Sequence, residues 1–233
     1  MSFLSYLING ISLGSVYAII ALGYTMVYGI ARMLNFAHGD IIMVGGFVIF
    51  TIVSTLGLPP MVGVLAAVIA CTVLGVVIER VAYKPLRGAS SLAVLITAIG
   101  VSYFLQNAAQ LLWGATPKNF TSLVTFPVPE LLAKFNVSAV SLVTIVACLV
   151  IMAGLMFFTG KTKMGKAMRA VSEDKAAAQL MGINVNRTIS MTFAIGSALA
   201  AIAGVLLCSY SPVLQPTTGA MPGIKAFDAA VFG

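Results

Sequence analysis

The polar side chains that could do chemistry in this chain stand in a few short clusters. Asn35, His38 and Asp40 fall within six residues, in the segment LNFAHGD at the start of an apolar run. Such groups are costly near a membrane helix unless they cap it, pair with one another or meet water. Two interpretations follow. Either Asn35 caps the helix and Asp40 lies in its first turn, or the segment lines a polar path or a helix break.

A second polar cluster lies inside a later apolar run. Gln106 and Gln110 are one helical turn apart with Asn107 beside them, so a helix presents all three on one side. A polar face on a membrane helix either packs against other helices or lines a cavity. The two clusters together define the candidate lining of a translocation path: Asn35, His38, Asp40, Gln106, Asn107 and Gln110.

No residue pattern predicts catalysis, a cofactor or a metal site. His38 is the only histidine and could titrate near pH 6.5, but a single histidine is weak grounds for a metal site or a proton relay. The segment TGKTK resembles the end of a phosphate-binding loop, yet Leu155 stands where that motif needs glycine. We therefore expect a chain that is not an enzyme and cannot hydrolyse ATP itself. The cysteines stand in separate apolar runs and are expected to pack as small residues: Cys71, Cys148 and Cys208.

The composition places the chain in a membrane. Hydrophobic residues make up 60% and charged residues 8% of the 233 residues, against roughly 25% charged in an ordinary soluble domain. Long unbroken apolar runs indicate helices, because a membrane helix needs about 20 apolar residues whereas barrel strands are shorter and alternate. We predict an all-α, polytopic transmembrane helical bundle with six complete spans and the start of a further one near the C-terminus. The expected spans lie at 6–30, 35–55, 61–78, 92–113, 138–158 and 189–208, with a re-entrant segment at 35–46 as the alternative for the second.

Two of these runs carry small residues at helical spacing. Gly10 and Gly14 form a GxxxG pair, and Gly196, Ala200 and Gly204 form a longer small-residue face. Small residues let two membrane helices approach closely, because little side chain separates their backbones. We expect neighbouring helices to pack on both faces.

The basic residues indicate how the spans are oriented. The net charge of +7 is better explained by the excess of lysine and arginine in cytoplasmic connections than by nucleic-acid binding. The connections 79–87 and 161–187 are both basic and are separated by two spans, so both belong inside. The connection 114–137, with a short surface helix expected at 130–134, then lies outside together with the N-terminus, and Arg32 lies inside.

The connection 161–187 is the one long polar stretch of the chain, and it carries six of the thirteen basic residues. We expect a short helix within it that begins with Ser172 as its cap, has two acidic residues in its first turn and ends at Gly182. A helix this short is marginal in water and needs a surface to dock on. Leu180 and Met181 provide apolar contacts, either for a partner or for the protein's own cytoplasmic face.

Three ordered blocks of sequence carry a family resemblance. They are LNFAHGD with the following Gly45 and Gly46, KPLRGASSLAVLITAIGVSYFLQN, and GKAMRAVSEDKAAAQLMGINVNRTISMTFAIGSALAAIAGVL. Together they resemble the permease subunits of the branched-chain amino acid type of ABC importer. The resemblance implies a multi-pass protein of the bacterial inner membrane that imports leucine, isoleucine and valine. Permeases for urea, short amides or other amino acids are the alternative within the family. A secondary transporter, with His38 and Asp40 as its proton relay, is the alternative outside it.

In that family the polar stretch resembles the coupling loop, which docks on a cytoplasmic ATPase subunit. Ala177, Ala178 and Gly182 fit the A-A-x-x-x-G part of its pattern, whereas the expected glutamate position holds Ala176 and Glu173 stands upstream. The resemblance therefore implies a cytoplasmic coupling helix within residues 161–187. Its expected contact residues are Glu173, Ala177, Ala178, Leu180, Met181 and Gly182.

The resemblance also implies the partners. They are a second homologous permease, two cytoplasmic ATPase subunits that use ATP and magnesium, and an external, periplasmic solute-binding protein. This chain itself is expected to bind no cofactor. We expect residues 1–233 to form a single transmembrane permease domain. Family members carry further spans after the point where this chain stops, which leads us to expect a C-terminally truncated chain.

Overall fold

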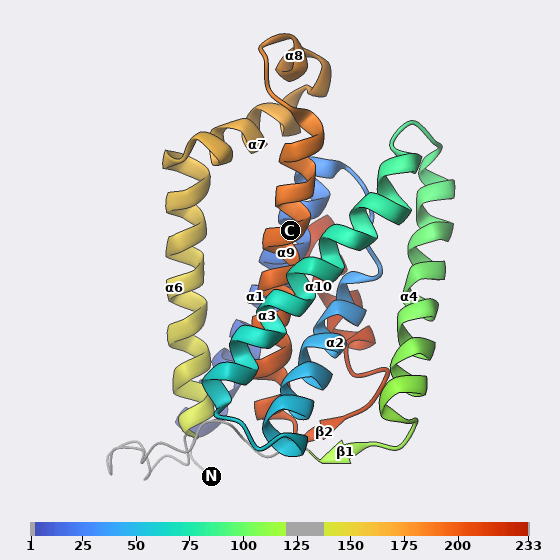
Figure 1. The fold of residues 1–233 in the computed structure, drawn as a ribbon. Coiled ribbons are helices and arrows are strands. Elements are labelled where there is room, and N and C mark those ends of the chain that lie inside the picture. Colours follow the sequence, from blue (N-terminus) through green and yellow to red (C-terminus); the bar gives the residue numbers. More distant parts are fainter. Residues whose placement is uncertain (1–2, 120–137, 233) are drawn as a thin grey trace.

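The computed structural model describes residues 3–119 and 138–232. Within them the chain is helical apart from one short pair of strands, and the long helices run side by side between two ends of the molecule (Figure 1). The surface helix expected at 130–134 falls outside the described residues. The helices are α1 (Phe3–Ala31), α2 (His38–Phe50), α3 (Pro60–Ile78), α4 (Ser91–Trp113), α6 (Ala139–Lys161), α7 (Lys163–Glu173), α8 (Lys175–Leu180), α9 (Val185–Tyr210) and α10 (Ala220–Phe232). The strands are β1 (Lys118–Asn119) and β2 (Val213–Leu214).

Six of the described helical segments are long and apolar enough to cross a membrane. They match the six expected spans, so the predicted bundle is confirmed. The third span is longer than expected, because α3 continues through a π-helical turn (Glu79–Tyr83) and a 3-10 turn (Lys84–Leu86) that take up most of the basic connection. In the second span a π-helical turn (Thr51–Thr55) extends α2. The segment His38–Thr55 is therefore one helical run of 18 residues, long enough to be a span.

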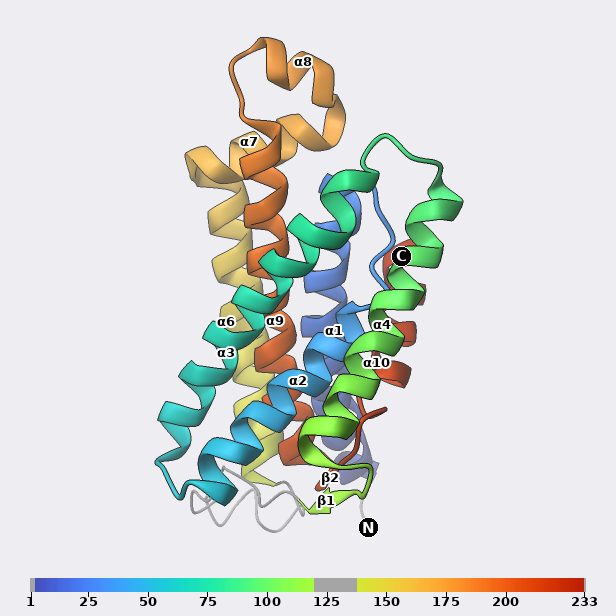
Figure 2. The same cartoon turned by 45° about the vertical axis from the view of Figure 1, so that its right-hand side comes forward.

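The central helix of the bundle is α9, which packs against α1, α2 and α3. Its apolar window is 72% buried, against 22% for α4 and 17% for α6. The last two helices lie on opposite flanks of the bundle in Figure 1, and the turned view in Figure 2 keeps α4 at the edge. Their exposed side chains are mostly apolar, as a lipid or another membrane subunit requires of a helix that faces it.

The core closes most tightly on the small-residue face of α9. A Cβ atom added to Gly196 would lie 3.1 Å from a backbone carbonyl oxygen of α1, and one added to Gly204 would lie 2.4 Å from the carbonyl oxygen of Ile42 in α2. The close approach predicted for this face is confirmed. The same prediction for Gly10 and Gly14 is wrong within the described chain, because nothing lies within 4 Å of a Cβ atom at either position.

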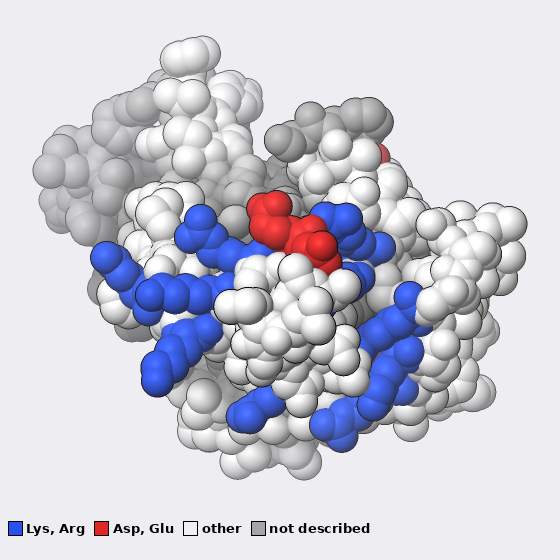
Figure 3. Space-filling model, turned by 90° about the horizontal axis from the view of Figure 1, so that it is seen from above, with Lys and Arg blue, Asp and Glu red and all other residues white. Residues whose placement is uncertain are grey.

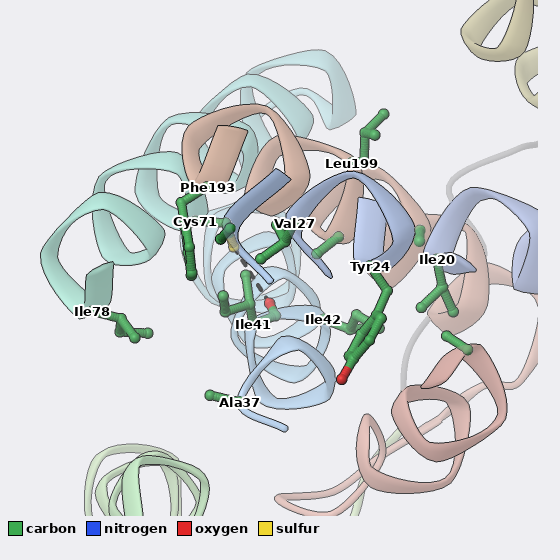
Figure 4. Packing of buried hydrophobic residues seen from close by; sticks show 14 of the residues in the cluster. Ile20, Tyr24, Val27, Ala37, Ile41, Ile42, Cys71, Ile78, Phe193 and Leu199 are labelled. Carbon is green, nitrogen blue, oxygen red and sulfur yellow. Dashed lines mark hydrogen bonds between the residues drawn. The ribbon is translucent and has the colours of Figure 1, made fainter. Parts of the chain in front are cut away.

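Buried side chains of α1, α2, α3 and α9 converge around these contacts (Figure 4). Ile41 and Ile42 of α2, Val27 of α1 and Phe193 of α9 belong to one buried cluster, in which Ile42 lies beside Tyr24 of α1. Cys71 of α3 donates a hydrogen bond from its Sγ to the Ile41 carbonyl oxygen at 3.5 Å. As expected, the cysteines are buried packing residues without disulfides: Cys71, Cys148 and Cys208.

Several helix starts are determined by a side chain that directly precedes the helix. The side chains of Ser90, Ser138, Thr162 and Asn184 each accept a hydrogen bond from a backbone N–H three residues on, at the starts of α4, α6, α7 and α9. These oxygens satisfy N–H groups that have no partner inside the helix. Pro60 begins α3, where its missing N–H is not needed.

The connections predicted to share a side meet at one end of the molecule, here called the basic end. Arg32 donates a hydrogen bond to the Ser172 carbonyl oxygen, and Arg87 donates to the Asn186 side chain, so three connections lie together. At the opposite end β1 pairs antiparallel with β2. The predicted alternation of the connections is confirmed. Seen from above, lysine and arginine side chains gather on the basic end around a small acidic patch (Figure 3).

Candidate functional site

The amphipathic helix α7 lies across the basic end. Gly165, Met168 and Val171 are buried at helical spacing, whereas basic residues such as Lys166 are exposed. A Cβ atom added to Gly165 would lie 2.2 Å from the carbonyl oxygen of Phe158 in α6. Glycine therefore permits the sharp corner between α6 and α7, and the corner directs the polar stretch over the bundle.

The next helix, α8, begins at Asp174. The Oδ1 atom of Asp174 accepts hydrogen bonds from the N–H groups of Ala176 and Ala177, at 2.7 and 3.1 Å. The expectation that Ser172 caps this helix is wrong, because α7 continues through Glu173 and leaves Ser172 inside its last turn. The cap lies two residues further on, where the backbone leaves the helical conformation and the Asp174 side chain reaches the free N–H groups.

The far end of α8 presents two apolar side chains to solvent. Leu180 is 89% exposed and Met181 is 82% exposed, while Ala178 on the other side of the helix is buried. Gly182 then reverses the chain with a φ of 83°, a left-handed conformation that favours glycine and confirms the predicted helix end. All the predicted coupling residues except Ala178 are exposed. The helix stands beyond the rest of the bundle in both ribbon views (Figures 1 and 2).

Two basic residues hold this segment on the end of α1. The Nη2 atom of Arg32 donates to the carbonyl oxygens of Ser172 and Glu173, the last residues of α7, at 2.8 and 3.3 Å. The Nζ atom of Lys175 donates to the carbonyl oxygen of Ala31, the last residue of α1, at 2.8 Å. Both cations therefore lie at negative ends of helix dipoles. Partial burial, together with two nearby arginines, lowers the pKa of Lys175. The sequence analysis did not identify this pair.

The predicted path residues of the LNFAHGD segment are buried inside the bundle. Asn35 is 2% exposed, His38 is 1% exposed and Asp40 is 2% exposed. The Oδ1 atom of Asn35 accepts a hydrogen bond from the Tyr83 hydroxyl at 2.9 Å, and its backbone N–H donates to the Tyr24 hydroxyl at 3.2 Å. The expectation that Asn35 caps α2 is wrong, because its side chain binds Tyr83 instead. Asp40 lies in the first turn of α2, as expected.

The histidine of this segment packs against Gly23 of α1, which has no side chain. The His38 ring lies edge-on to Tyr24 with 5.8 Å between ring centroids. A Cβ atom added to Gly23 would lie 3.2 Å from His38 Nε2, so the absence of a side chain at Gly23 makes room for the ring. The Nδ2 atom of Asn35 has no hydrogen-bond partner within residues 3–119 and 138–232. The α2 start is thus a polar, irregular region enclosed by apolar helices.

One contact joins the two predicted polar clusters. The Nε2 atom of Gln106 donates to Asp40 Oδ1 at 2.9 Å and to Ser102 Oγ at 3.2 Å, which ties α4 to α2. Asn107 and Gln110 are exposed, and the Asn107 amide donates to a carbonyl oxygen of its own helix. Four of the six predicted path residues therefore belong to the α2–α4 region of the interior, and two lie on the outside of α4.

A buried ion pair at the basic end was missed by the sequence analysis. Glu79 has a fully buried side chain that accepts from Arg87 and, at 2.6 Å, from the Ser190 hydroxyl. Arg87 also donates to the side chain of Asn186. The network ties the end of the third span to the first turns of α9. Its only sequence signal was a glutamate directly after a long apolar run.

The described residues offer no catalytic or metal-binding constellation. Within 3–119 and 138–232, no three histidine, cysteine, aspartate or glutamate side chains are placed to hold a metal ion. A pocket of about 330 Å³ opens at the basic end between the end of α1 and the start of α4, and Arg32, Arg87 and Lys175 contribute to its lining. No carboxylate or imidazole lines this pocket. Its chemistry is that of a basic surface recess beside α8.

Comparison with known proteins decides the family. The family described as the branched-chain amino acid transport system permease component matches residues 6–233 of this chain. The chain belongs to this family. The match covers the buried α2 start, the basic-end segment and α9, which are the elements that build the candidate site. No solved structure matches the chain.

Relatives of this branched-chain permease span most of its length. The high-affinity branched-chain amino acid transport system permease protein BraD of Pseudomonas aeruginosa is 42% identical over 99% of this chain and 79% of its own length. LivH of Escherichia coli K12, which carries the same description, is also 42% identical with the same coverage of both chains. The probable LivH of Methanocaldococcus jannaschii is 28% identical over 92% of this chain and 69% of its own length.

Membership of the branched-chain permease family determines the class of protein. The chain is a multi-pass permease component of an ABC transporter. In such a transporter the ATPase activity resides in partner subunits, and a solute-binding protein is the further partner. The chain therefore works by moving a solute and not by chemistry of its own.

Proposed function

We propose that this chain is the membrane-spanning subunit of an ATP-driven importer that moves leucine, isoleucine and valine across the bacterial inner membrane. The family and the described roles of BraD and LivH support this substrate class. The six spans, with α9 at their centre, provide the bundle that the solute crosses. We treat residues 1–233 as one permease domain.

The working complex contains four further components. A second homologous permease completes the transmembrane part, and two ATPase subunits bind at the basic end, which faces the cytoplasm because lysine and arginine concentrate there. A solute-binding protein docks at the opposite, external end. ATP and magnesium are bound by the ATPase subunits, and this chain carries no cofactor.

The exposed tip of α8 is the observation that supports coupling most directly. Leu180 and Met181 are 89% and 82% exposed on a helix that projects from the basic end. Exposed apolar residues at the end of a short, capped helix fit a groove on a partner, in the manner of a helix laid into a hydrophobic groove. Glu173, Ala177 and Gly182 stand beside this tip and complete the docking surface.

The contacts of α8 explain how a movement of the ATPase subunits reaches the bundle. Lys175 and Arg32 connect the segment to the end of α1. Asn184 caps α9 only three residues after Met181, so the central helix follows the same segment. A displacement of α8 therefore acts on α1 and α9 together; α9 packs along α2, and Tyr24 of α1 contacts Asn35 and His38 at the α2 start.

The six predicted polar residues border the translocation path in this proposal. Asn35, His38, Asp40 and Gln106 form the buried polar wall that supports the irregular start of α2. Asn107 and Gln110 lie on the exposed side of α4, where a second permease subunit or an aqueous path would cover them. Buried polar groups in a membrane bundle are costly, which favours a transport role over simple packing.

Replacing Leu180 or Met181 by aspartate tests the coupling assignment. Both side chains are almost free of contacts, so the bundle should fold normally, while a charge at the tip should prevent docking in an apolar groove. The measurement is the amount of ATPase subunit that co-purifies from detergent-solubilised membranes. Leu58→Asp makes the same change at an exposed site between the second and third spans, at the opposite end, and should retain the ATPase. Normal recovery of the ATPase with Leu180→Asp and Met181→Asp would show that α8 does not couple.

A further inference from the structure

A lysine lies at the mid-depth of the bundle. Lys225 of α10 places its Nζ atom 3.4 Å from the hydroxyl of Tyr17 and 4.9 Å from the centroid of the Tyr17 ring. Tyr17 is the central residue of the 29 residues of α1. At 1.5 Å per residue it is roughly 20 Å from either end of that helix. The ammonium group therefore lies near the middle of the membrane.

This position is unfavourable for a cation that faces lipid. Lys225 is exposed on the surface of the described chain, and so is Asp228, three residues further along α10. Within residues 3–119 and 138–232, no carboxylate lies within ion-pair distance of the Lys225 ammonium group. A charged side chain at the bilayer centre is costly unless it pairs or faces water or protein. Lys225 and Asp228 therefore face water or protein and not lipid, although the apolar Met221 and Ile224 are exposed on the same helix.

The structure also shows why Lys225 cannot avoid this environment. Long lysine side chains near helix ends usually extend toward the membrane surface, but this one is directed over the Tyr17 ring, which attracts the cation with its π face. The opposite side of α10 is fixed by packing: a Cβ atom added to Gly223 would lie 2.9 Å from the Cα atom of Gly39, and Phe227 contacts the Tyr24 ring. The helix cannot rotate to hide the charge.

Depth and charge together define which group this surface would bind. Lipid phosphates lie at the two membrane interfaces, about 15 Å from the middle of the hydrocarbon core. An anion that reaches the central depth must be carried there, and a transported α-amino acid has a carboxylate. It also has an ammonium group close to that carboxylate. A helix separates the Cβ atoms of residues three apart by about 5–6 Å, so Lys225 and Asp228 present opposite charges at a spacing suited to such a zwitterion.

We propose that Lys225 is a substrate-contacting residue of the translocation path, which holds the carboxylate of the α-amino acid at the middle of the membrane. Tyr17 positions the Lys225 ammonium group and offers its hydroxyl as a second donor. Asp228 attracts the substrate ammonium group. This assignment rests on the proposed amino acid transport function. Lys225 is exposed in the described residues, whereas Asn35, His38 and Asp40 of the polar wall at the α2 start are buried.

The test uses the complete transporter, reconstituted in liposomes with its ATPase subunits and its solute-binding protein. Leucine uptake and ATP hydrolysis are measured for the wild type and for Lys225→Met, Lys225→Arg, Tyr17→Phe and the control Met221→Leu, which alters an exposed apolar residue of the same helix. We expect Lys225→Met to lower leucine uptake roughly tenfold to hundredfold, the loss expected for one hydrogen bond to a charged group. Lys225→Arg should retain most of the uptake because it keeps the cation, and Tyr17→Phe should give a smaller loss.

The outcomes separate the possible explanations. Wild-type uptake by Lys225→Met overturns the inference and leaves the proposed function intact. Loss of the second permease subunit from the purified Lys225→Met complex would also overturn it, because Lys225 would then be a subunit-interface residue. If the wild-type complex imports no branched-chain amino acid, the proposed function fails and the inference fails with it. Support requires an intact Lys225→Met complex that hydrolyses ATP but imports little leucine.

Discussion

Arg32 binds the C-terminal end of α7, and Lys175 binds the C-terminal end of α1, across the basic end. Arg32 directly follows α1 and donates to the last carbonyl groups of α7, while Lys175 follows α7 and donates to the last carbonyl group of α1. Arg32 thus lies at the negative, C-terminal end of the α7 dipole, and Lys175 lies at the negative, C-terminal end of the α1 dipole. The exchange joins two segments that lie about 140 residues apart in the sequence, and it is the most direct link between α8 and the bundle.

The first prediction concerns this exchange. The double variant Arg32→Met and Lys175→Met should weaken the hold of α8 on α1 without removing the docking tip, so ATPase binding should persist. Each contact is partly exposed and is expected to contribute only about 1 kcal/mol. We expect a several-fold fall in leucine molecules imported per ATP hydrolysed in proteoliposomes. Lys163→Met, on the exposed side of α7, is the control. If the double variant imports as much leucine per ATP hydrolysed as the wild type, Arg32 and Lys175 do not transmit the movement of α8 to α1.

The second prediction concerns the corner between α6 and α7. Gly165→Ala should destabilise the protein by about 1–3 kcal/mol, the usual cost of overpacking, because the new Cβ atom would lie 2.2 Å from the Phe158 carbonyl oxygen. Gly160→Ala is the matched control in α6, since no atom lies within 4 Å of a Cβ atom there. Thermal unfolding in detergent measures both. Equal melting temperatures for the two variants would contradict the tight corner.

The third prediction concerns the buried pair at the end of the third span. Arg87→Met leaves the fully buried Glu79 carboxylate without its cation and should cost about 3–5 kcal/mol, as for other broken buried pairs. Adding Glu79→Gln removes the stranded charge and should restore part of that loss. Thermal unfolding of both single variants and the double variant measures the coupling energy. Additive losses would mean that the two residues do not interact.

The fourth prediction concerns the link between α4 and α2. Gln106→Leu removes the amide that donates to the buried Asp40 carboxylate and should destabilise the bundle by about 1.5–3 kcal/mol. Asn107→Leu is the adjacent control. Its amide bonds only to its own helix on an exposed face, so the melting temperature should change little. If Asn107→Leu is as destabilising as Gln106→Leu, the buried contact is not what holds α4.

Several expectations from the sequence failed because the local residue pattern was compatible with more than one outcome. Asn35 is a good cap residue next to a helix start, but the Tyr83 hydroxyl, 48 residues away, takes its side-chain oxygen. Ser172 has the right chemistry for a cap, but α7 continues past it to Glu173. The GxxxG pair of α1 and the small-residue face of α9 look alike in sequence, and only the latter receives a neighbour in the described chain. Local preference could not choose between these outcomes.

The sequence by itself determined the membrane class, the six spans, the side on which each connection lies and the exposed polar segment with its glycine end. Each of these depends on composition or on neighbours a few residues apart, and a bilayer enforces them directly. Only the tertiary structure decided that Gln106 binds Asp40 and that Lys225 lies beside the centre of α1. It also decided that Arg32 binds the end of α7 and Lys175 binds the end of α1. Those contacts join residues 66 to 208 positions apart, and they follow from how the helices pack around α9, which no local pattern encodes.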